Sequence, residues 1–257
     1  MKKLNILVSN DDGINAEGIF ALARSLKAIA DVTVVAPASQ QSAVGQAITV
    51  NYPLRVFPFH KNSDFFGYAV EGTPADCVKL GVKFLLKQKP DMVISGINHG
   101  SNTAINIIYS GTVSAATEGT ILGIPSLAIS LTSYQSQDFS YAAKLAARLA
   151  LLVAEQGLPP KTLLNVNVHA VSEEEIKGVK VTKQGISTWE DRFDVRRDPA
   201  NREYFWLTGN MNVIDTEPDS DQIAIRENYV SVTPVKYELT DNILLERMKQ
   251  WGVEKLK

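Results

Sequence analysis

Short apolar runs that alternate with helical segments constrain the fold of this chain more than any other feature. The first such unit has an apolar run at residues 4–8, a predicted helix at 16–30 and a second apolar run at 32–36. Runs of this kind, bounded by turn residues, are typical of buried strands. Strand–helix–strand is the building unit of a parallel sheet. The unit lacks the G-x-G-x-x-G pattern, which disfavours a dinucleotide site.

The same alternation continues along the chain. Further strands are predicted at 91–95, 126–130, 163–168 and 229–234, and helices at 113–122, 138–156 and 242–251. Another helix begins clearly at Thr73, a good N-cap that forms a capping box with Asp76, and Pro74 suits the first helical position. Cys77, beside the apolar stripe of this helix, is interpreted as a small core residue. The alternating asparagines of residues 163–168 suggest a strand at the edge or end of the sheet.

The C-terminal third differs in character, so we divide the chain into an α/β core, residues 1–170, and an extension, residues 171–257. Within the extension, residues 185–222 form a long, polar and weakly periodic segment, with Trp189, Tyr204, Phe205 and Trp206 between charged runs. Loops of this length usually have a function or are stabilised by a partner. Exposed aromatic residues there indicate contact between subunits.

Composition narrows the class of protein. With 257 residues, 45% hydrophobic and 21% charged, the chain is typical of a globular α/β protein. The net charge of -2 argues against a general nucleic-acid-binding surface. A single cysteine excludes a multi-cysteine zinc site. No signal peptide is apparent and no stretch approaches the ~20 apolar residues of a membrane span, so we expect a cytoplasmic protein.

Polar residues follow several predicted strands at the point where each strand ends. Asp11 and Asp12 come after the first strand, Ser42 lies in the loop after the second, and Asn98 and Asn102 follow a later one. The carboxyl ends of parallel strands meet at one sheet edge, where ligands bind. Adjacent carboxylates ~4 Å apart repel by roughly 1 kcal/mol in water and about 4 near a protein surface. A divalent cation would offset this repulsion; an Asx-rich turn that only ends the strand is the alternative.

A second polar cluster, Ser110-Gly111-Thr112, precedes the helix predicted at 113–122. Free backbone N–H groups and the helix dipole favour phosphate at such a position, although simple capping also explains one hydroxyl. Carboxylate, hydroxyl and amide oxygens suit Mg²⁺ or Mn²⁺ better than zinc. Together the clusters predict metal-assisted hydrolysis of a phosphomonoester. His99 is either a proton donor to the leaving group or a structural loop residue.

Seven motifs carry a family likeness. They are SNDDG at 9–13, VVAP at 34–37 with Ser42 beyond, GTPADCV at 72–78, SGINHGSN at 95–102, YSGTVSAATEG at 109–119, LLNVNV at 163–168 and YVSVTP at 229–234. Their residues and order closely resemble the SurE (survival protein E) family of 5′/3′-nucleotidases, over nearly the full length of the chain.

The resemblance implies an α/β fold with a Rossmann-like, mostly parallel sheet, helices on both faces, and a C-terminal extension exchanged between subunits of a homodimer or homotetramer. It implies a 5′-nucleotidase that uses one divalent ion and metal-activated water on nucleoside 5′- and 3′-monophosphates. Some family members also act on short polyphosphate. The implied metal ligands are Asp11, Asp12, Ser42 and Asn98, of which the two aspartates are also catalytic. The residues implied to surround the phosphate are Asn102, Ser110, Gly111 and Thr112.

One departure from the family pattern concerns the Ser42 loop. The family often has Asp/Glu-Arg-x-Arg-Ser-Gly there, whereas this chain has the neutral pair Gln40-Gln41 before Ser42. A non-catalytic protein that binds metal and nucleotide therefore remains an alternative. A receiver-like signalling module is disfavoured, because the strand at 91–95 is followed by Gly96-Ile97-Asn98 and not by an acceptor aspartate, and no lysine follows residues 126–130.

Overall fold

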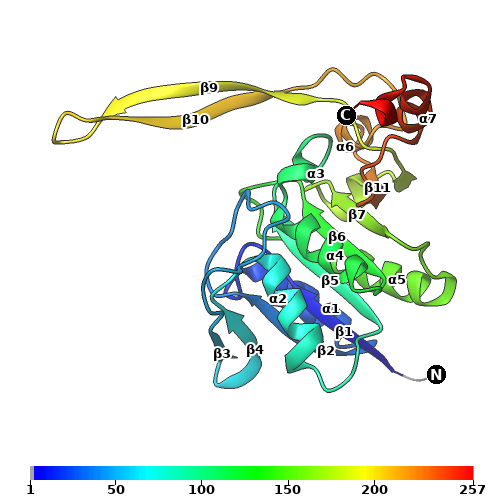
Figure 1. Cartoon of the computed structure of the whole chain (residues 1–257). Helices are drawn as coiled ribbons and strands as arrows, with labels where there is room; N and C mark the ends of the chain where they lie inside the picture. The colour runs from blue at the N-terminus through cyan, green and yellow to red at the C-terminus, as the bar shows by residue number, and fades with distance from the viewer. Residues whose placement is uncertain (1–2, 257) are drawn as a thin grey trace.

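A nine-stranded sheet forms the centre of the molecule (Figure 1). The structure, a computed structural model, describes residues 3–256. The strand order is β3-β4-β2-β1-β5-β6-β7-β11-β8. The strands are β1 Leu4–Ser9, β2 Ala30–Pro37, β3 Val56–Lys61, β4 Asp64–Val70, β5 Met92–His99, β6 Ser126–Leu131, β7 Thr162–Val168, β8 Val179–Val181 and β11 Val230–Lys236.

Neighbouring strands from β4 to β7 are all parallel, and only β3 and β11 pair antiparallel with the strands beside them, β4 and β7. The mostly parallel sheet predicted from the alternating pattern is thus confirmed. The first predicted helix is too long, however. It ends at Leu26, because Ala30 already pairs with Leu4 as the first residue of β2.

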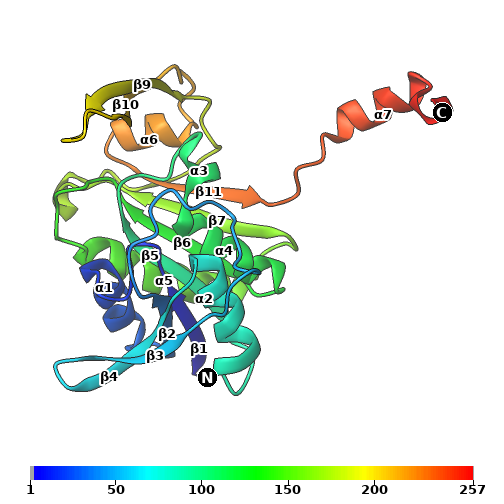
Figure 2. The same cartoon turned by 60° about the vertical axis from the view of Figure 1, so that its left-hand side comes forward.

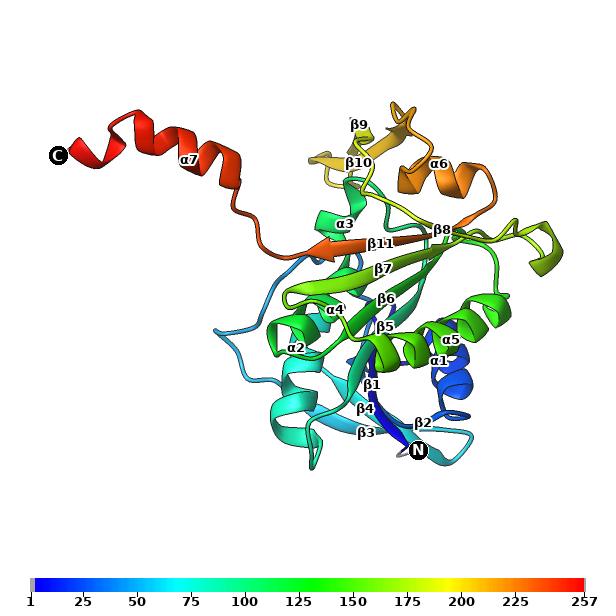
Figure 3. The ribbon, with the colours of Figure 1, turned by 90° about the vertical axis from the view of Figure 1, so that its right-hand side faces the viewer.

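Helices cover both faces of the sheet (Figure 3). Helices α1 (Glu17–Leu26) and α5 (Ser140–Gln156) lie on one face, and α2 (Pro74–Leu80) and α4 (Gly111–Ile121) on the other. Alternate residues of β1 point to opposite faces of the sheet and pack in a different hydrophobic core on each face. Ile6 and Val8 pack with α1 and α5, whereas Leu7 packs with α2 and α4. Shorter helices are α3 (Asn106–Tyr109), α6 (Asp221–Arg226) and α7 (Asn242–Gln250). Within residues 3–256, no helix is long and apolar enough to span a membrane.

The start of α2 confirms the predicted capping box. The Thr73 hydroxyl accepts a hydrogen bond from the Asp76 backbone N–H at 3.1 Å, and the Asp76 carboxylate accepts from the Thr73 N–H at 2.9 Å. Cys77 is fully buried within the core beside this helix, as predicted. Burial also raises the pKa of its thiol, which is consistent with an inert core residue.

Two sequence predictions about later segments are wrong. Strand β7 is not at an edge, since it lies between β6 and β11 with Asn165 and Asn167 fully buried. Residues 185–222 are not an irregular loop, because they contain a long hairpin of β9 (Thr188–Arg197) and β10 (Glu203–Asn212). The hairpin extends away from the sheet domain (Figure 1). Both strands are exposed within this chain, and the charged residues among their apolar ones conceal the alternation that identifies a strand in sequence.

The C-terminal helix α7 also lies away from the sheet domain (Figure 2). The connection between β11 and α7 carries it outward, and no residue of α7 is buried. The chain therefore has two projecting elements, the β9–β10 hairpin and α7.

Candidate active site

The candidate site lies where the order of the sheet reverses. The chain passes from β1 to β2 and then to β4 on one side of β1, and it returns to place β5 on the other side of β1. A crevice forms beyond the strand ends at such a point. The turn after β1 is closed by Asn10 Nδ2, which donates to Gly13 O at 2.9 Å. Gly13 has φ +91°, a conformation that favours glycine.

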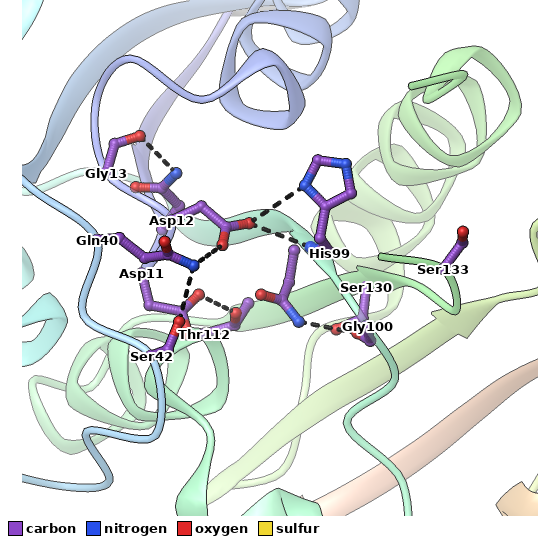
Figure 4. A network of polar contacts seen from close by, with 12 residues as sticks. Asp11, Asp12, Gly13, Gln40, Ser42, His99, Gly100, Thr112, Ser130 and Ser133 are labelled. Carbon is purple, nitrogen blue, oxygen red and sulfur yellow. Dashed lines mark hydrogen bonds and ion pairs between the residues drawn. The ribbon is translucent and has the colours of Figure 1, made fainter. Parts of the chain in front are cut away.

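Asp11 is almost buried, with 6% of its surface exposed. The Thr112 hydroxyl donates to its Oδ1 atom (Figure 4). A Cβ atom at Gly111 would lie only 2.7 Å from Asp11 Cβ, so a glycine there allows α4 to begin against this carboxylate. Burial raises the pKa of Asp11 to about 6, and the charge of Asp12 adds to the effect while the Thr112 hydrogen bond opposes it.

Asp12 is held from two sides. The backbone N–H of His99 donates to its Oδ2 at 3.1 Å, and His99 Nδ1 lies 3.9 Å from the same oxygen. On the other side, Gln40 Nε2 lies 3.5 Å from Asp12 Oδ1 and 2.8 Å from Ser42 Oγ (Figure 4). Burial also raises the pKa of Asp12. His99, whose role the sequence left open, thus contacts a predicted metal ligand, and its Nε2 faces Ser136 O at 3.1 Å.

Asn98 lies on β5 and not in the loop after it. The prediction that β5 ends at Ser95 is wrong, because the strand resumes pairing with β6 at Asn98 after a register shift. Asn98 Nδ2 donates to Gly100 O at 2.8 Å, so its amide oxygen is the end free to bind a cation. Ser42 is exposed on the loop after β2, and its Oγ receives the hydrogen bond from Gln40.

These residues fit a hard divalent cation. The buried Asp11 and the partly buried Asp12 have raised pKa values and adjoin in sequence, and within residues 3–256 no Lys or Arg forms an ion pair with either. No group of three or more His, Cys, Asp or Glu arranged to hold a metal occurs in that range. The ligand set would therefore combine the carboxylates with the neutral oxygens of Asn98 and Ser42, which suits Mg²⁺ or Mn²⁺.

The predicted phosphate-binding residues at the start of α4 are buried. Ser110 is the N-cap, and its Oγ accepts from the Val113 N–H at 3.0 Å. The Thr112 hydroxyl points to Asp11. Capping therefore accounts for Ser110, and Thr112 orients a carboxylate. A direct contact of residues 110–112 with substrate stays a prediction.

Asn102 is held by two residues that sequence reasoning missed. Asn167 Oδ1 accepts from the Asn102 N–H at 2.7 Å, and the Asn102 carbonyl accepts from Asn165 Nδ2 at 2.7 Å. The Asn102 side chain donates to Ser130 Oγ at 2.8 Å. The sequence feature that could have identified this contact is the pair of asparagines at alternate positions of an otherwise apolar strand. They indicate a buried polar contact and not a sheet edge.

Comparison with known proteins decides the family. The sequence pattern described as Survival protein SurE matches residues 6–191. The chain belongs to the SurE family. It is 49% identical to the 5′-nucleotidase SurE of Chlorobium phaeobacteroides over 255 residues, covering 99% of both chains. It is 47% identical to the 5′-nucleotidase SurE of Thermosipho melanesiensis, covering 96% of this chain and 97% of the relative.

A solved SurE structure shares the fold. The SurE protein from Aquifex aeolicus superposes with a TM-score of 0.83 at 40% identity, over 96% of this chain and 99% of that one. The Rossmann-like fold that the motifs implied is thus confirmed. Within the SurE pattern, the neutral loop of this chain has a visible structural consequence. The Gln40 amide, rather than a basic side chain, links Asp12 to Ser42.

Proposed function

We propose that the chain is a 5′-nucleotidase that hydrolyses nucleoside monophosphates to nucleoside and phosphate with one divalent cation, Mg²⁺ or Mn²⁺. The observation that carries the proposal is the pair Asp11 and Asp12. Asp11 is buried and Asp12 partly buried, burial raises the pKa of both, and neither forms an ion pair with Lys or Arg within residues 3–256. They lie at the ligand-binding edge of the sheet. The relatives of this protein are named 5′-nucleotidase SurE.

In this proposal Asp11, Asp12, Ser42 and Asn98 hold the cation. When bound, such an ion polarises the phosphoryl group and lowers the pKa of a coordinated water. The protein's own part is orientation. Thr112 fixes Asp11, and the His99 N–H fixes Asp12. The substrate phosphate would face Asn102 and the start of α4, where the helix dipole favours an anion.

A substrate panel tests this proposal. We expect phosphate release from nucleoside 5′-monophosphates that requires Mg²⁺ or Mn²⁺ and stops in chelator. Asp12→Asn should lower kcat/KM by more than about 100-fold, since partners of the ligands alone are typically worth 10–100-fold. Asp138→Asn is the matched control, because the Asp138 carboxylate is exposed and accepts its hydrogen bonds from Ser140. Full activity in chelator or in Asp12→Asn would contradict the proposal. The same panel should include 3′-monophosphates and short polyphosphate, which we propose as further substrates.

The neutral Gln40-Gln41 loop supports one alternative, a protein that binds metal and nucleotide without turnover. If basic residues of this loop help to bind the phosphate in relatives, their absence weakens phosphate binding in this protein. Stable nucleotide binding with no phosphate release, in any metal, would favour this alternative over the enzyme.

We also propose that the chain forms a homodimer or homotetramer through its projecting elements. Large apolar side chains gather there with nothing of their own chain over them, and such patches mark interaction surfaces. They are Phe193, Val195, Phe205, Trp206 and Leu207 on the hairpin and Ile243, Leu244 and Leu245 on α7. Exchange of these elements between subunits would cover both patches. The cytoplasmic location stays a prediction.

A further inference from the structure

The loop of residues 101–105 joins β5 to α3 and carries Asn102. Its inner side is held by Asn165 and Asn167 of β7, as described above. Its outer side is held by side chains from residues 184–222, at the base of the hairpin. Trp189 Nε1 donates to Asn106 Oδ1 at 2.6 Å, and Gln222 Nε2 donates to Thr103 Oγ1 at 2.8 Å. The remaining two contacts converge on a single residue, Ala104.

Ala104 has an unusual backbone. Its φ is +49°, in the left-handed region that side chains other than glycine rarely adopt. Both of its backbone polar groups are bound by the hairpin base: its N–H donates to Asp221 Oδ2 at 3.0 Å, and its carbonyl accepts from Gln184 Nε2 at 2.9 Å. Ala104 is fully buried. Such conformations persist only where the surroundings determine them, and here two distant side chains do so.

Asp221 ties this loop to the hairpin base. It is fully buried, and its second oxygen accepts from the Gly185 N–H at 3.0 Å. One carboxylate thus joins residue 104 of the sheet domain to residue 185. The neighbouring Asp215 bonds to Ile186, Ser187 and Ser220 and makes no hydrogen bond to residues 101–106. Asp221 therefore binds the loop of residues 101–105, whereas Asp215 does not, although both aspartates are buried at the base of the hairpin.

We propose that Gln184 and Asp221 are positioning residues for the phosphomonoesterase reaction. By holding Ala104 in its left-handed conformation, they fix the path of the loop that carries Asn102 and leads through α3 to Ser110. The C-terminal extension then contributes to the site within its own subunit, apart from any contact between subunits. This inference rests on the proposed function, in which Asn102 lies at the phosphate.

Gln184→Ala is the decisive variant, because it removes one contact to Ala104 and leaves the buried Asp221 in place. We expect KM for a nucleoside 5′-monophosphate to rise about tenfold, with kcat and Mn²⁺ affinity changed less than threefold. Amide exchange of residues 101–106 should become at least tenfold faster. Adding Ala104→Gly should return KM toward the wild-type value, because glycine adopts the left-handed conformation without its cost. A merely structural loss of stability would not be rescued in this way.

Lys183→Ala is the matched control, since Lys183 is exposed, pairs with Glu217 and Asp219, and does not touch the loop. Lys183→Ala should leave both KM and the amide exchange of residues 101–106 unchanged. Unchanged KM and exchange in Gln184→Ala would overturn the inference, as would faster exchange with an unchanged KM. If the wild-type protein releases no phosphate from any nucleotide, the proposed function fails first. Amide exchange would still show whether the hairpin base holds the loop.

Discussion

Asp11 is a carboxylate that the fold keeps from water without a basic ion-pair partner among residues 3–256. Because its pKa is raised from 3.8 to about 6 in the folded protein, protonated Asp11 favours folding. Its contribution is fully present below pH ~4 and is lost as the pH rises through about 6. In chelator, the ionised Asp11 should therefore lower the free energy of unfolding by up to about 3 kcal/mol at pH 7.5.

Asp11→Asn should remove that cost. In chelator, we expect the variant to be more stable than the wild type at pH 7.5 and equally stable near pH 4, while losing activity in metal. Urea unfolding at a series of pH values measures the difference. A variant that is less stable at pH 7.5 would show that Asp11 has a structural role instead.

Thr112 gives a second prediction at this scale, because its hydroxyl orients Asp11. Residues that hydrogen-bond to metal ligands are typically worth 10–100-fold in affinity or activity. Thr112→Val should weaken Mn²⁺ binding, measured by calorimetry, within this range, and Thr112→Ser should restore it. Thr120→Val, which alters a buried hydroxyl farther along the same helix, should bind Mn²⁺ normally. Unchanged Mn²⁺ affinity in Thr112→Val would leave its hydroxyl free for the phosphate, as the family motif implies.

Among elements, sequence patterns predicted the parallel strands and the helices well, because each has an apolar face with a clear period. Sequence patterns failed where both faces of a strand have the same environment. Strand β7 is fully enclosed, so its asparagines serve a buried loop, and the hairpin is open on both faces. Strand β5 continues past Gly96, which the turn-like composition of 96–102 concealed. The sequence placed Asp11 and Asp12 at the sheet edge because they follow a strand end and match a family motif, and their role as metal ligands stays a prediction. Sequence patterns did not identify Asn165, Asn167, Gln184 and Asp221, because the hydrogen-bond partners of these residues lie 63 to 117 residues away in the chain.

Strand β7 supports a prediction that compares its two asparagines. Asn167→Ala would leave the buried Asn102 N–H without an acceptor, which typically costs about 1–3 kcal/mol. Asn165→Ala should cost less, because the Asn102 carbonyl keeps a second donor in Asn167 Nδ2 at 3.2 Å. Denaturant unfolding of both variants measures the order. Equal losses would mean that the Asn102 N–H finds another partner.

For the whole molecule, the two proposed roles of the extension, contact between subunits and positioning within one subunit, can be tested separately. Deleting residues 185–222, as the sequence alone would suggest, removes the exposed hairpin and also Asp221, which holds Ala104. Replacing only residues 190–210 with a short Gly-Ser linker removes Phe193, Phe205 and Trp206 and keeps Gln184, Trp189 and Asp221. The narrower deletion thus isolates contact between subunits from positioning within one subunit.

We expect this narrower deletion to lower the particle mass measured by light scattering, because the apolar hairpin would no longer cover a second subunit. KM should change less than in Gln184→Ala, whose particle mass in turn should equal that of the wild type. Reduced mass in one variant and raised KM in the other would assign the two roles to different residues of the extension. An unchanged mass after the deletion would instead assign subunit contact to α7 or to the sheet domain.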